Sequence, residues 1–321
     1  MSPSVIKITD KEAIESAINI LNNGQCVAIP TETVYGLAAD ATDGEAVARI
    51  FEMKGRPRFN PLICHVDGLE MAERHGTFCA LSRKLAESFW PGPLTLVVDV
   101  KEKSTLHPLV RAGLSTVGLR CPNGPASMLI QQFGKPLAAP SANRSGRISP
   151  TRADHVATEF QDTNLLVLDG GACEGGIEST IVRASGESIV LLRPGSVTAN
   201  MIESACGIRP GVYNGDGIEA PGMMTSHYAP DATVVLDCKA LPQDGAWLQF
   251  GETAHTDLPH RNLSRSGSLT EAAANLYDFL KELDATGVRT IFVSPVPETG
   301  IGIAINDRLR RAAAPRPGHD T

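Results

Sequence analysis

A segment rich in glycine and proline, from Ile208 to Pro230, interrupts an otherwise regular alternation of apolar runs and amphipathic stretches. It carries no sustained hydrophobic period, so it predicts a connecting segment and not a helix or a strand. The chain has 321 residues, whereas single hydrophobic cores stop growing at about 250–300 residues. We therefore expect two domains, at 1–207 and 231–321, joined by a linker at 208–230.

Both domains are predicted to be of the α/β class. Before the linker, short apolar runs such as 26–30 and 62–66 predict buried strands, and the stretch 10–23 has helical spacing. After the linker, β-rich runs alternate with helices expected at 269–283 and about 300–314. Strands that alternate with helices indicate parallel pairing, so the second domain is expected to be a small parallel-sheet domain.

A basic loop, KGRPRFNP at 54–61, follows a predicted helix. Its cations are Lys54, Arg56 and Arg58. The helix is expected to start with a capping box of Thr42 and Glu45 and to end at Gly55. Two prolines stiffen the loop, and side chains held in this way lose less entropy when they bind a phosphate chain. A solvated surface loop is the alternative interpretation.

Charge and composition exclude several classes of protein. The net charge of −7 argues against a protein that binds nucleic acid over its whole surface, although a local basic cleft stays open. The chain starts without a signal-peptide pattern and contains no run of about 18 apolar residues, so we expect a cytoplasmic protein without a membrane segment. Its seven cysteines are scattered and lack a CxxC pair, so neither disulfides nor a zinc site are expected.

Polar residues gather directly after predicted strands. TETVY at 31–35 follows a buried strand, where open α/β sheets place ligand groups, although an N-cap and turn cluster is the alternative. Alternation sets His65 opposite its apolar neighbours, so it faces either solvent or a site. The loop at 135–151 supplies hydroxyls, an amide and backbone N–H groups, which are hydrogen-bond partners for phosphates. The chain lacks a P-loop, a dinucleotide fingerprint, HExxH and GxSxG, which leaves electrostatic positioning of phosphates as the favoured chemistry.

Several of these segments occur together in one known family. In chain order they are PTETVYGLAADA, KGRPRFNPLICHV, PGPLTLVV, VGLRCP, PLAAPSANRSGRISPT, GGIESTIV, LLRPGSV and APGMMTSHYAP. Ordered in this way, they resemble the two-domain threonylcarbamoyl-AMP synthase family with its YrdC-like catalytic domain. GIGIAINDRLRRAA, near the end of the chain, resembles the close of that family's smaller domain.

The resemblance implies a fold and a reaction. The expected fold is a YrdC-like twisted mixed sheet with helices, followed by an ordered linker and a smaller Rossmann-like α/β domain. The implied enzyme is a nucleotidyltransferase that converts L-threonine, bicarbonate and ATP into threonylcarbamoyl-AMP and pyrophosphate for tRNA modification. Mg²⁺ is expected to arrive on ATP, with no metal ligands from the protein and no organic cofactor. tRNA and a downstream threonylcarbamoyl-transferase complex are candidate partners.

The resemblance also implies site residues. Its catalytic motif corresponds here to Lys54, Arg56, Ser141 and Asn143. The implied ATP-binding residues are Arg56, Asn60, Thr116, Ser141, Ser149, Arg193 and Tyr228. The implied threonine-binding residues are Thr33, His65, Arg120, the backbone at Ala139, and Ser179. Arginine pairs bidentately with carboxylates and neutralises phosphates, which agrees with this division.

Other interpretations stay open from the sequence. Tyr228, with Met223, Met224 and His227, would form a lid over a pocket, since long loops of this kind are often lids. The rival functions are an RNA-binding or regulatory YrdC-like protein and a carbamoyltransferase that forms a carbamoyl-adenylate. The second domain is expected to be regulatory or to provide a docking surface.

Overall fold

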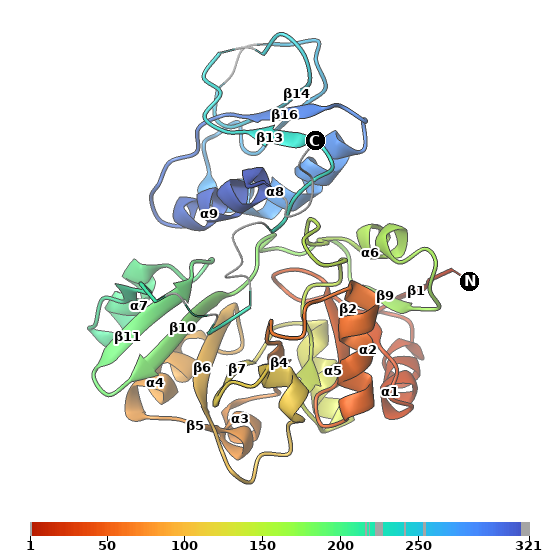
Figure 1. Ribbon diagram of the computed structural model, residues 1–321, viewed down its shortest axis with the longest axis vertical. Helices are drawn as coiled ribbons and strands as arrows, with labels where there is room; N and C mark the ends of the chain where they lie inside the picture. The colour runs from red at the N-terminus through yellow and green to blue at the C-terminus, as the bar shows by residue number, and fades with distance from the viewer. Residues whose placement is uncertain are drawn as a thin grey trace.

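The chain folds around two separate β-sheets. The computed structural model describes residues 2–215, 217, 219–221, 227–240, 242–252 and 255–315. A 12-stranded sheet forms the large domain and a four-stranded sheet forms the small domain, which stands on top of the large one in Figure 1. Met223 and Met224, expected to belong to a lid, lie outside the described residues, as does the end of the chain after Pro315.

The large sheet is mixed, as the family resemblance implied. Its strands run in the order β1-β9-β2-β3-β8-β4-β7-β6-β10-β11-β12, with β5 beside β6. The strands are β1 (Ser4–Lys7), β2 (Val27–Ile29), β3 (Gly36–Asp40), β4 (Ile63–His65), β5 (Gly76–Thr77), β6 (Leu94–Val100), β7 (Thr116–Arg120), β8 (Leu137–Ala138), β9 (Leu166–Asp169), β10 (Thr180–Ser185), β11 (Ser188–Arg193) and β12 (Gly211–Val212). Strand β4 pairs parallel to β7 and antiparallel to β8, so both kinds of ladder meet near the centre of the sheet.

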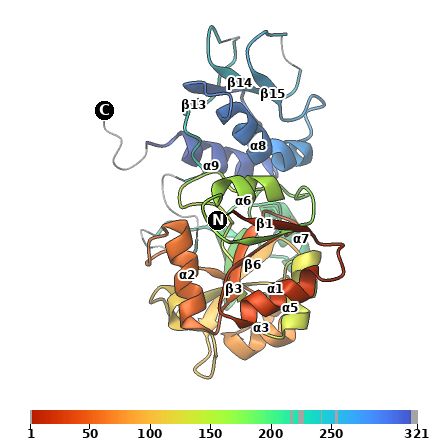
Figure 2. The same ribbon diagram turned by 90° about the vertical axis from the view of Figure 1, so that its right-hand side faces the viewer.

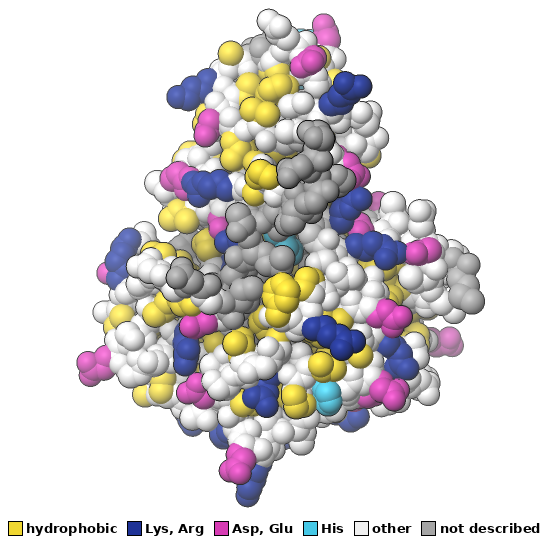
Figure 3. Space-filling model, viewed as in Figure 1, with side chains coloured by type: hydrophobic (Ala, Val, Ile, Leu, Met, Phe, Trp, Pro, Cys, Tyr) yellow, Lys and Arg dark blue, Asp and Glu magenta, His cyan; other side chains and the backbone are white. Residues whose placement is uncertain are grey.

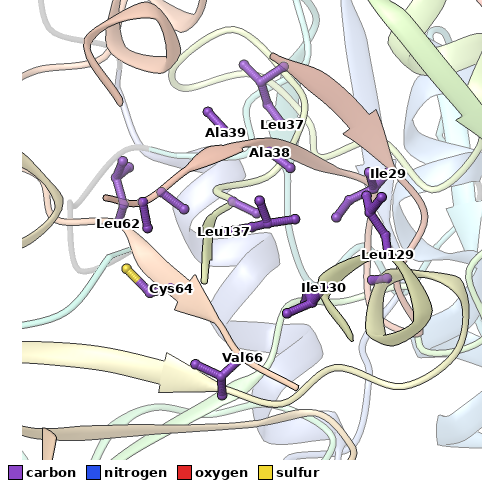
Figure 4. Packing of buried hydrophobic residues seen from close by; sticks show 14 of the residues in the cluster. Ile29, Leu37, Ala38, Ala39, Leu62, Cys64, Val66, Leu129, Ile130 and Leu137 are labelled. Atoms are coloured by element: carbon purple, nitrogen blue, oxygen red, sulfur yellow. The ribbon is translucent and has the colours of Figure 1, made fainter. Parts of the chain in front are cut away.

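The helices of the large domain pack on this sheet. They are α1 (Ala13–Asn22), α2 (Gly44–Lys54), α3 (Leu69–His75), α4 (Ala80–Phe89), the 3₁₀ helix η1 (Pro108–Arg111), α5 (Pro125–Phe133), α6 (Ala153–Glu159) and α7 (Ala199–Cys206). Figure 4 shows Ile29 and Leu137 from the sheet near Leu129 and Ile130 from α5. The main core of the large domain is therefore an apolar layer between the sheet and its helices.

The small domain contains a parallel sheet, which confirms the expected pairing. Its strands run in the order β13-β16-β14-β15, and every neighbouring pair is parallel. The elements are β13 (Thr233–Val235), β14 (Ala246–Gln249), β15 (His260–Asn262), α8 (Leu269–Asp284), β16 (Thr290–Val293) and α9 (Gly302–Ala313). Figures 1 and 2 both show α8 and α9 between the small sheet and the large domain. These two helices therefore provide the surface that meets the large domain.

The expected start of α2 is wrong by one residue. Asp43 is the N-cap, and its Oδ1 accepts from the backbone N–H of Glu45 at 2.9 Å. Thr42 instead donates its hydroxyl to Oδ1 of Asp40 at 2.6 Å. A carboxylate at a helix N-terminus also interacts favourably with the helix dipole, so it is preferred there over a hydroxyl. The expected end is confirmed, because Gly55 is left-handed at φ 58°.

The described part of the linker is ordered at both ends. Strand β12 pairs parallel to β11 and extends the edge of the large sheet. At the far end, Ala229 forms a bridge with Arg147, and its N–H donates to the carbonyl of Gly146 at 2.9 Å. The linker is therefore anchored to the large domain before β13 begins. Within the part of the chain that the structure describes, no helix is long and apolar enough to cross a membrane.

Candidate active site

A central pocket lies over one face of the large sheet, beneath the small domain. Its lining residues are Thr33, Val34, Arg56, Ile63, His65, Arg120, Ala139, Pro140, Ser141, Glu178, Ser179, Arg193, Pro221, His227 and Tyr228. Ile63 and His65 are two residues apart on β4, so their side chains point to the same face. Their alternate neighbours Leu62, Cys64 and Val66 belong to the apolar core on the other face. His65 therefore faces the site and not solvent.

His65 and Arg120 stand side by side in the pocket wall, because they are register partners on β4 and β7. Both ring nitrogens of His65 are buried and have no hydrogen-bond partner among the described residues. Burial, and then the charge of Arg120, lowers the pKa of His65 well below its usual range. The imidazole is therefore neutral near pH 7, with one nitrogen able to donate and the other able to accept a hydrogen bond.

Arg120 is held in place by two partners outside the pocket lining. Its Nη2 lies 2.7 Å from Oε1 of Glu32, and its Nε donates to the carbonyl of Gly92 at 3.3 Å. Glu32 also accepts the backbone N–H of Asn123 at 3.1 Å. Arg120 is only 4% exposed, so its guanidinium is desolvated and oriented before any ligand binds.

Another wall is built around Ser179 and Arg193. Ser179 directly precedes β10, and Arg193 is the last residue of β11. The Nη2 of Arg193 donates to the carbonyl of Ser179 at 2.9 Å and to its hydroxyl at 3.1 Å. That hydroxyl is also 2.7 Å from Oγ1 of Thr95. Nη1 of Arg193 donates to the carbonyl of Pro221, a linker residue, at 3.3 Å. This arginine thus joins the sheet to the linker at the pocket.

The first two cations of the basic loop lie in different environments. Arg56 lines the pocket and donates to the carbonyls of Asn60 and Pro61 at 3.1 and 2.8 Å. Burial lowers its pKa to about 10, so it remains a cation near pH 7. Lys54 is buried outside the lining, and its Nζ donates to the carbonyls of Ser141, at 2.5 Å, and Asn143. Lys54 therefore supports the loop that forms one wall of the pocket.

The pocket brings together most of the residues that the sequence predicted. The predicted residues in its lining are Thr33, Arg56, His65, Arg120, Ala139, Ser141, Ser179, Arg193 and Tyr228. Other predicted residues are buried but are not among the described lining residues: Lys54, Asn60, Thr116, Asn143 and Ser149. The exposed Arg58 also lies outside the lining, in agreement with its lack of a matched role.

Sequence reasoning missed Glu178, a carboxylate in the pocket lining. It lies in the GGIEST motif, which was noted for Ser179 only. Its Oε1 accepts the hydroxyl of Ser149 at 2.5 Å, and its Oε2 accepts from Tyr277 Oη and Arg308 Nε, each at 2.9 Å. Burial acts to raise its pKa, but the charges of Arg308 and Arg193 outweigh burial and lower the pKa to about 2. The GGIEST motif contains Glu178 and could have drawn attention to it. The residues that bind the Glu178 carboxylate, however, are distant in the sequence.

His227 and Tyr228 form the part of the wall that comes from the linker. Tyr228 is 1% exposed and left-handed at φ 64°. Its ring centre lies 5.6 Å from that of Tyr277 on α8, and Arg308 on α9 lies over the same ring at 5.4 Å. Burial lowers the pKa of His227 to about 3. The small domain therefore holds the linker residues that close the pocket.

The acidic groups near the pocket do not form a dedicated metal site. Within the described ranges, no group of three or more His, Cys, Asp or Glu side chains is arranged to hold a metal ion. Both carboxylate oxygens of Glu178 already accept hydrogen bonds. All seven cysteines are free thiols.

Comparisons with known proteins match this architecture over nearly the whole chain. Residues 19–195 match the Sua5, YciO and YrdC family described as "Telomere recombination", and residues 197–314 match "Threonylcarbamoyl-AMP synthase, C-terminal domain". The threonylcarbamoyl-AMP synthase of Bacillus subtilis is 37% identical over 333 residues, which cover 96% of this chain and 95% of the relative. The chain belongs to the threonylcarbamoyl-AMP synthase family.

Another family member, from Pyrococcus abyssi, is 40% identical over 326 residues, with 94% of each chain covered. The crystal structure of P. abyssi Sua5 complexed with L-threonine superposes with a TM-score of 0.88 at 36% identity, covering 98% of each chain. These matches confirm the threonylcarbamoyl-AMP synthase family, the two-domain α/β fold and the nucleotidyltransferase type of enzyme that the sequence predicted.

Proposed function

We propose that the chain makes threonylcarbamoyl-AMP and pyrophosphate from L-threonine, bicarbonate and ATP in the central pocket. The observation that carries the proposal is the buried pair of Arg120 and His65. Both ring nitrogens of His65 have no hydrogen-bond partner within the described chain. Unsatisfied buried polar groups are costly, so a site that retains them is suited to a polar ligand. Family membership supports L-threonine as that ligand.

In this proposal, Arg120 binds the carboxylate of threonine. Its guanidinium is oriented by Glu32 and offers paired N–H donors, which match a carboxylate. His65, Thr33, Ser179 and the backbone at Ala139 bind the remaining polar groups of the amino acid. The relative from P. abyssi was crystallised with L-threonine, which supports this assignment.

ATP is proposed to occupy the side of the pocket that carries Arg56, Ser141, Arg193 and Tyr228. Both arginines are buried, and cations in a desolvated site neutralise phosphates more strongly than cations in water. Asn60, Thr116 and Ser149 are proposed to complete this side from behind the lining. Lys54 and Asn143 are proposed to act by fixing the shape of the loop around Ser141.

The chemistry follows from alignment and charge stabilisation. The amine of threonine forms a C–N bond to CO₂ with loss of a proton, or to bicarbonate with loss of water, and becomes a carbamate. A carbamate oxygen then forms a bond to the α-phosphorus of ATP, and the bond from that phosphorus to the pyrophosphate oxygen breaks. Arg56 and Arg193 stabilise the negative charge that collects on the phosphates. Mg²⁺ carried by ATP would supply further charge neutralisation.

The pocket must widen before both substrates fit. Its free volume is about 50 Å³, whereas pockets for drug-sized ligands measure about 300–1,000 Å³. Pro221, His227 and Tyr228 belong to the linker, so a movement of these residues would open the pocket without disturbing the sheet. Their return would exclude water from the carbamate and the mixed anhydride, which both hydrolyse readily.

Further parts of the proposal concern organisation and partners. We assign residues 1–207 to the catalytic domain, 208–230 to the linker and 231–321 to the small domain. The product is proposed to serve tRNA modification through a downstream transferase complex in the cytoplasm. On the face drawn in Figure 3, Lys and Arg side chains are interspersed with Asp and Glu, which gives no support to an RNA-binding module there.

The test is pyrophosphate release from ATP, with threonine and bicarbonate omitted in turn. We expect release only when both are present. Release that persists without threonine would overturn the proposal and favour a carbamoyltransferase. RNA affinity that falls with salt, without threonine-dependent pyrophosphate release, would favour the RNA-binding alternative.

A further inference from the structure

Glu178 places a negative charge in the wall of the pocket that is proposed to bind ATP. Glu178 lies two residues before β10 begins at Thr180, and the residue is 7% exposed. An uncompensated carboxylate at this position would repel the triphosphate, because buried charges are weakly screened. The site therefore needs a counter-charge for Glu178.

Two residues of the small domain contact this carboxylate. Arg308 of α9 donates its Nε to Oε2 at 2.9 Å, and Tyr277 of α8 donates its hydroxyl to the same oxygen at 2.9 Å. The Arg308 side chain is 0% exposed, and its Nη1 also donates to Asp307 at 2.6 Å. A fully buried arginine is stable only with such partners, so Arg308 is fixed in this position.

The same two residues contact the linker wall of the pocket. The ring of Tyr228 packs against that of Tyr277, and the guanidinium of Arg308 lies over its face. The second carboxylate oxygen of Glu178, Oε1, accepts a hydrogen bond from the hydroxyl of Ser149 at 2.5 Å. One network therefore links two helices of the small domain to two residues that are expected to bind ATP.

We propose that Arg308 and Tyr277 are positioning residues of the ATP site, through which the small domain neutralises and orients Glu178 and holds Tyr228. The inference deepens the proposed function and rests on it. It assigns the small domain a direct part in ATP binding, in place of a purely regulatory or docking role. Threonine is proposed to bind mainly to Arg120 and His65. Ser179, which follows Glu178 in the chain, is the threonine-binding residue beside this network, and its hydroxyl contacts Arg193 and Thr95 and not Arg308. Threonine affinity should therefore depend much less on Arg308 than ATP affinity does.

The test compares three variants at Arg308 and Glu178. Arg308→Met removes the cation that is hydrogen-bonded to Glu178 and keeps most of the side-chain volume, whereas the nearby charge of Arg193 remains. We expect the dissociation constant for ATP to rise about 10- to 100-fold and that for threonine to stay within about threefold, both measured by titration calorimetry. Arg308→Lys should retain part of the ATP affinity. Glu178→Gln combined with Arg308→Met should recover most of it, because neither charge is then left unpaired.

The control is Arg310→Met, on the same helix. Arg310 is exposed and pairs with Glu298, so its loss should leave ATP affinity unchanged. If Arg308→Met does not fold, Tyr277→Phe decides the question, because it removes one hydroxyl and should still raise the ATP dissociation constant about 3- to 10-fold.

Three results would overturn the inference while leaving the proposed function intact: unchanged ATP affinity in Arg308→Met, an equal loss of threonine affinity, or no recovery in the double variant. If Arg308→Met does not fold, unchanged ATP affinity in Tyr277→Phe overturns it equally. Failure of the unmodified chain to bind ATP, or to release pyrophosphate with all three substrates, would instead overturn the proposed function and the inference with it.

Discussion

Replacing Lys54 by methionine separates two explanations of the basic loop. If the ammonium of Lys54 contacts phosphate, the variant loses ATP affinity alone. The structure favours a different role, because Nζ donates to the carbonyls of Ser141 and Asn143 and the side chain is only 2% exposed. Methionine has a similar length but no donor, so it would leave both carbonyls without this partner.

The size of the effect follows from those two hydrogen bonds. A buried acceptor that loses its partner costs about 1–3 kcal/mol, so two acceptors cost about 2–6 kcal/mol. Carbonyls that reach water after the loop relaxes recover part of this cost. We therefore expect Lys54→Met to lower the free energy of unfolding by about 2–4 kcal/mol. Because Ser141 lies in the pocket lining, the displaced loop should also lower kcat/KM for both ATP and threonine, by about 10- to 100-fold.

The assay is urea unfolding together with steady-state pyrophosphate release at varied ATP and varied threonine. Arg58→Met is the matched control, since Arg58 is an exposed cation of the same loop. It should change the free energy of unfolding by no more than about 0.5 kcal/mol. The reasoning is refuted if Lys54→Met unfolds like the unmodified chain and weakens ATP binding alone.

Three further predictions concern the pocket. Arg120→Lys should raise KM for threonine at least about 10-fold with little change in ATP affinity, because lysine cannot form a bidentate pair; equal losses for both substrates would contradict this. His65 and His227 have lowered pKa values in the folded chain, so the unfolded chain binds protons first as the pH falls. The free energy of unfolding should therefore decrease as the pH is lowered from 6.5 to 5, by at most about 1.4 kcal/mol per pH unit for each histidine. When urea unfolding is measured at several pH values, His227→Asn should show a smaller decrease over this range. Calorimetry should detect Mg²⁺ binding only when ATP is present; Mg²⁺ binding to the chain alone would point to a protein-held site.

Local features of the fold were readable from the sequence because they depend on neighbouring residues. Gly55, Gly134 and Gly207 end helices in the left-handed conformation that glycine adopts most easily. The hydroxyl of Ser268 accepts the backbone N–H of Glu271 and caps α8, an interaction between residues three apart in the chain. The start of α2 was misplaced because the spacing of Thr42 and Glu45 fits a capping box, although the adjacent Asp43 is the better N-cap.

The candidate site was readable only in part. The alternation along β4 predicted that His65 points away from the apolar core, and its partner on β7 decided that it faces a site. Lys54 and Arg56 look equivalent in the sequence, yet one supports a loop from behind and the other lines the pocket. Lys54 is the last residue of α2, whereas Arg56 follows the left-handed Gly55, so the two side chains start from different backbone conformations.

By itself, the sequence determined the two α/β domains, the break between them and, through its ordered motifs, the family. Only the tertiary structure decided which buried charges meet. Glu178 binds Tyr277 and Arg308, which are 99 and 130 residues away along the chain. Periodicity and capping describe interactions over a few residues, whereas this contact depends on how α8 and α9 pack against the large domain. No local pattern encodes that packing, so the link between the small domain and the ATP site appears only in the folded chain.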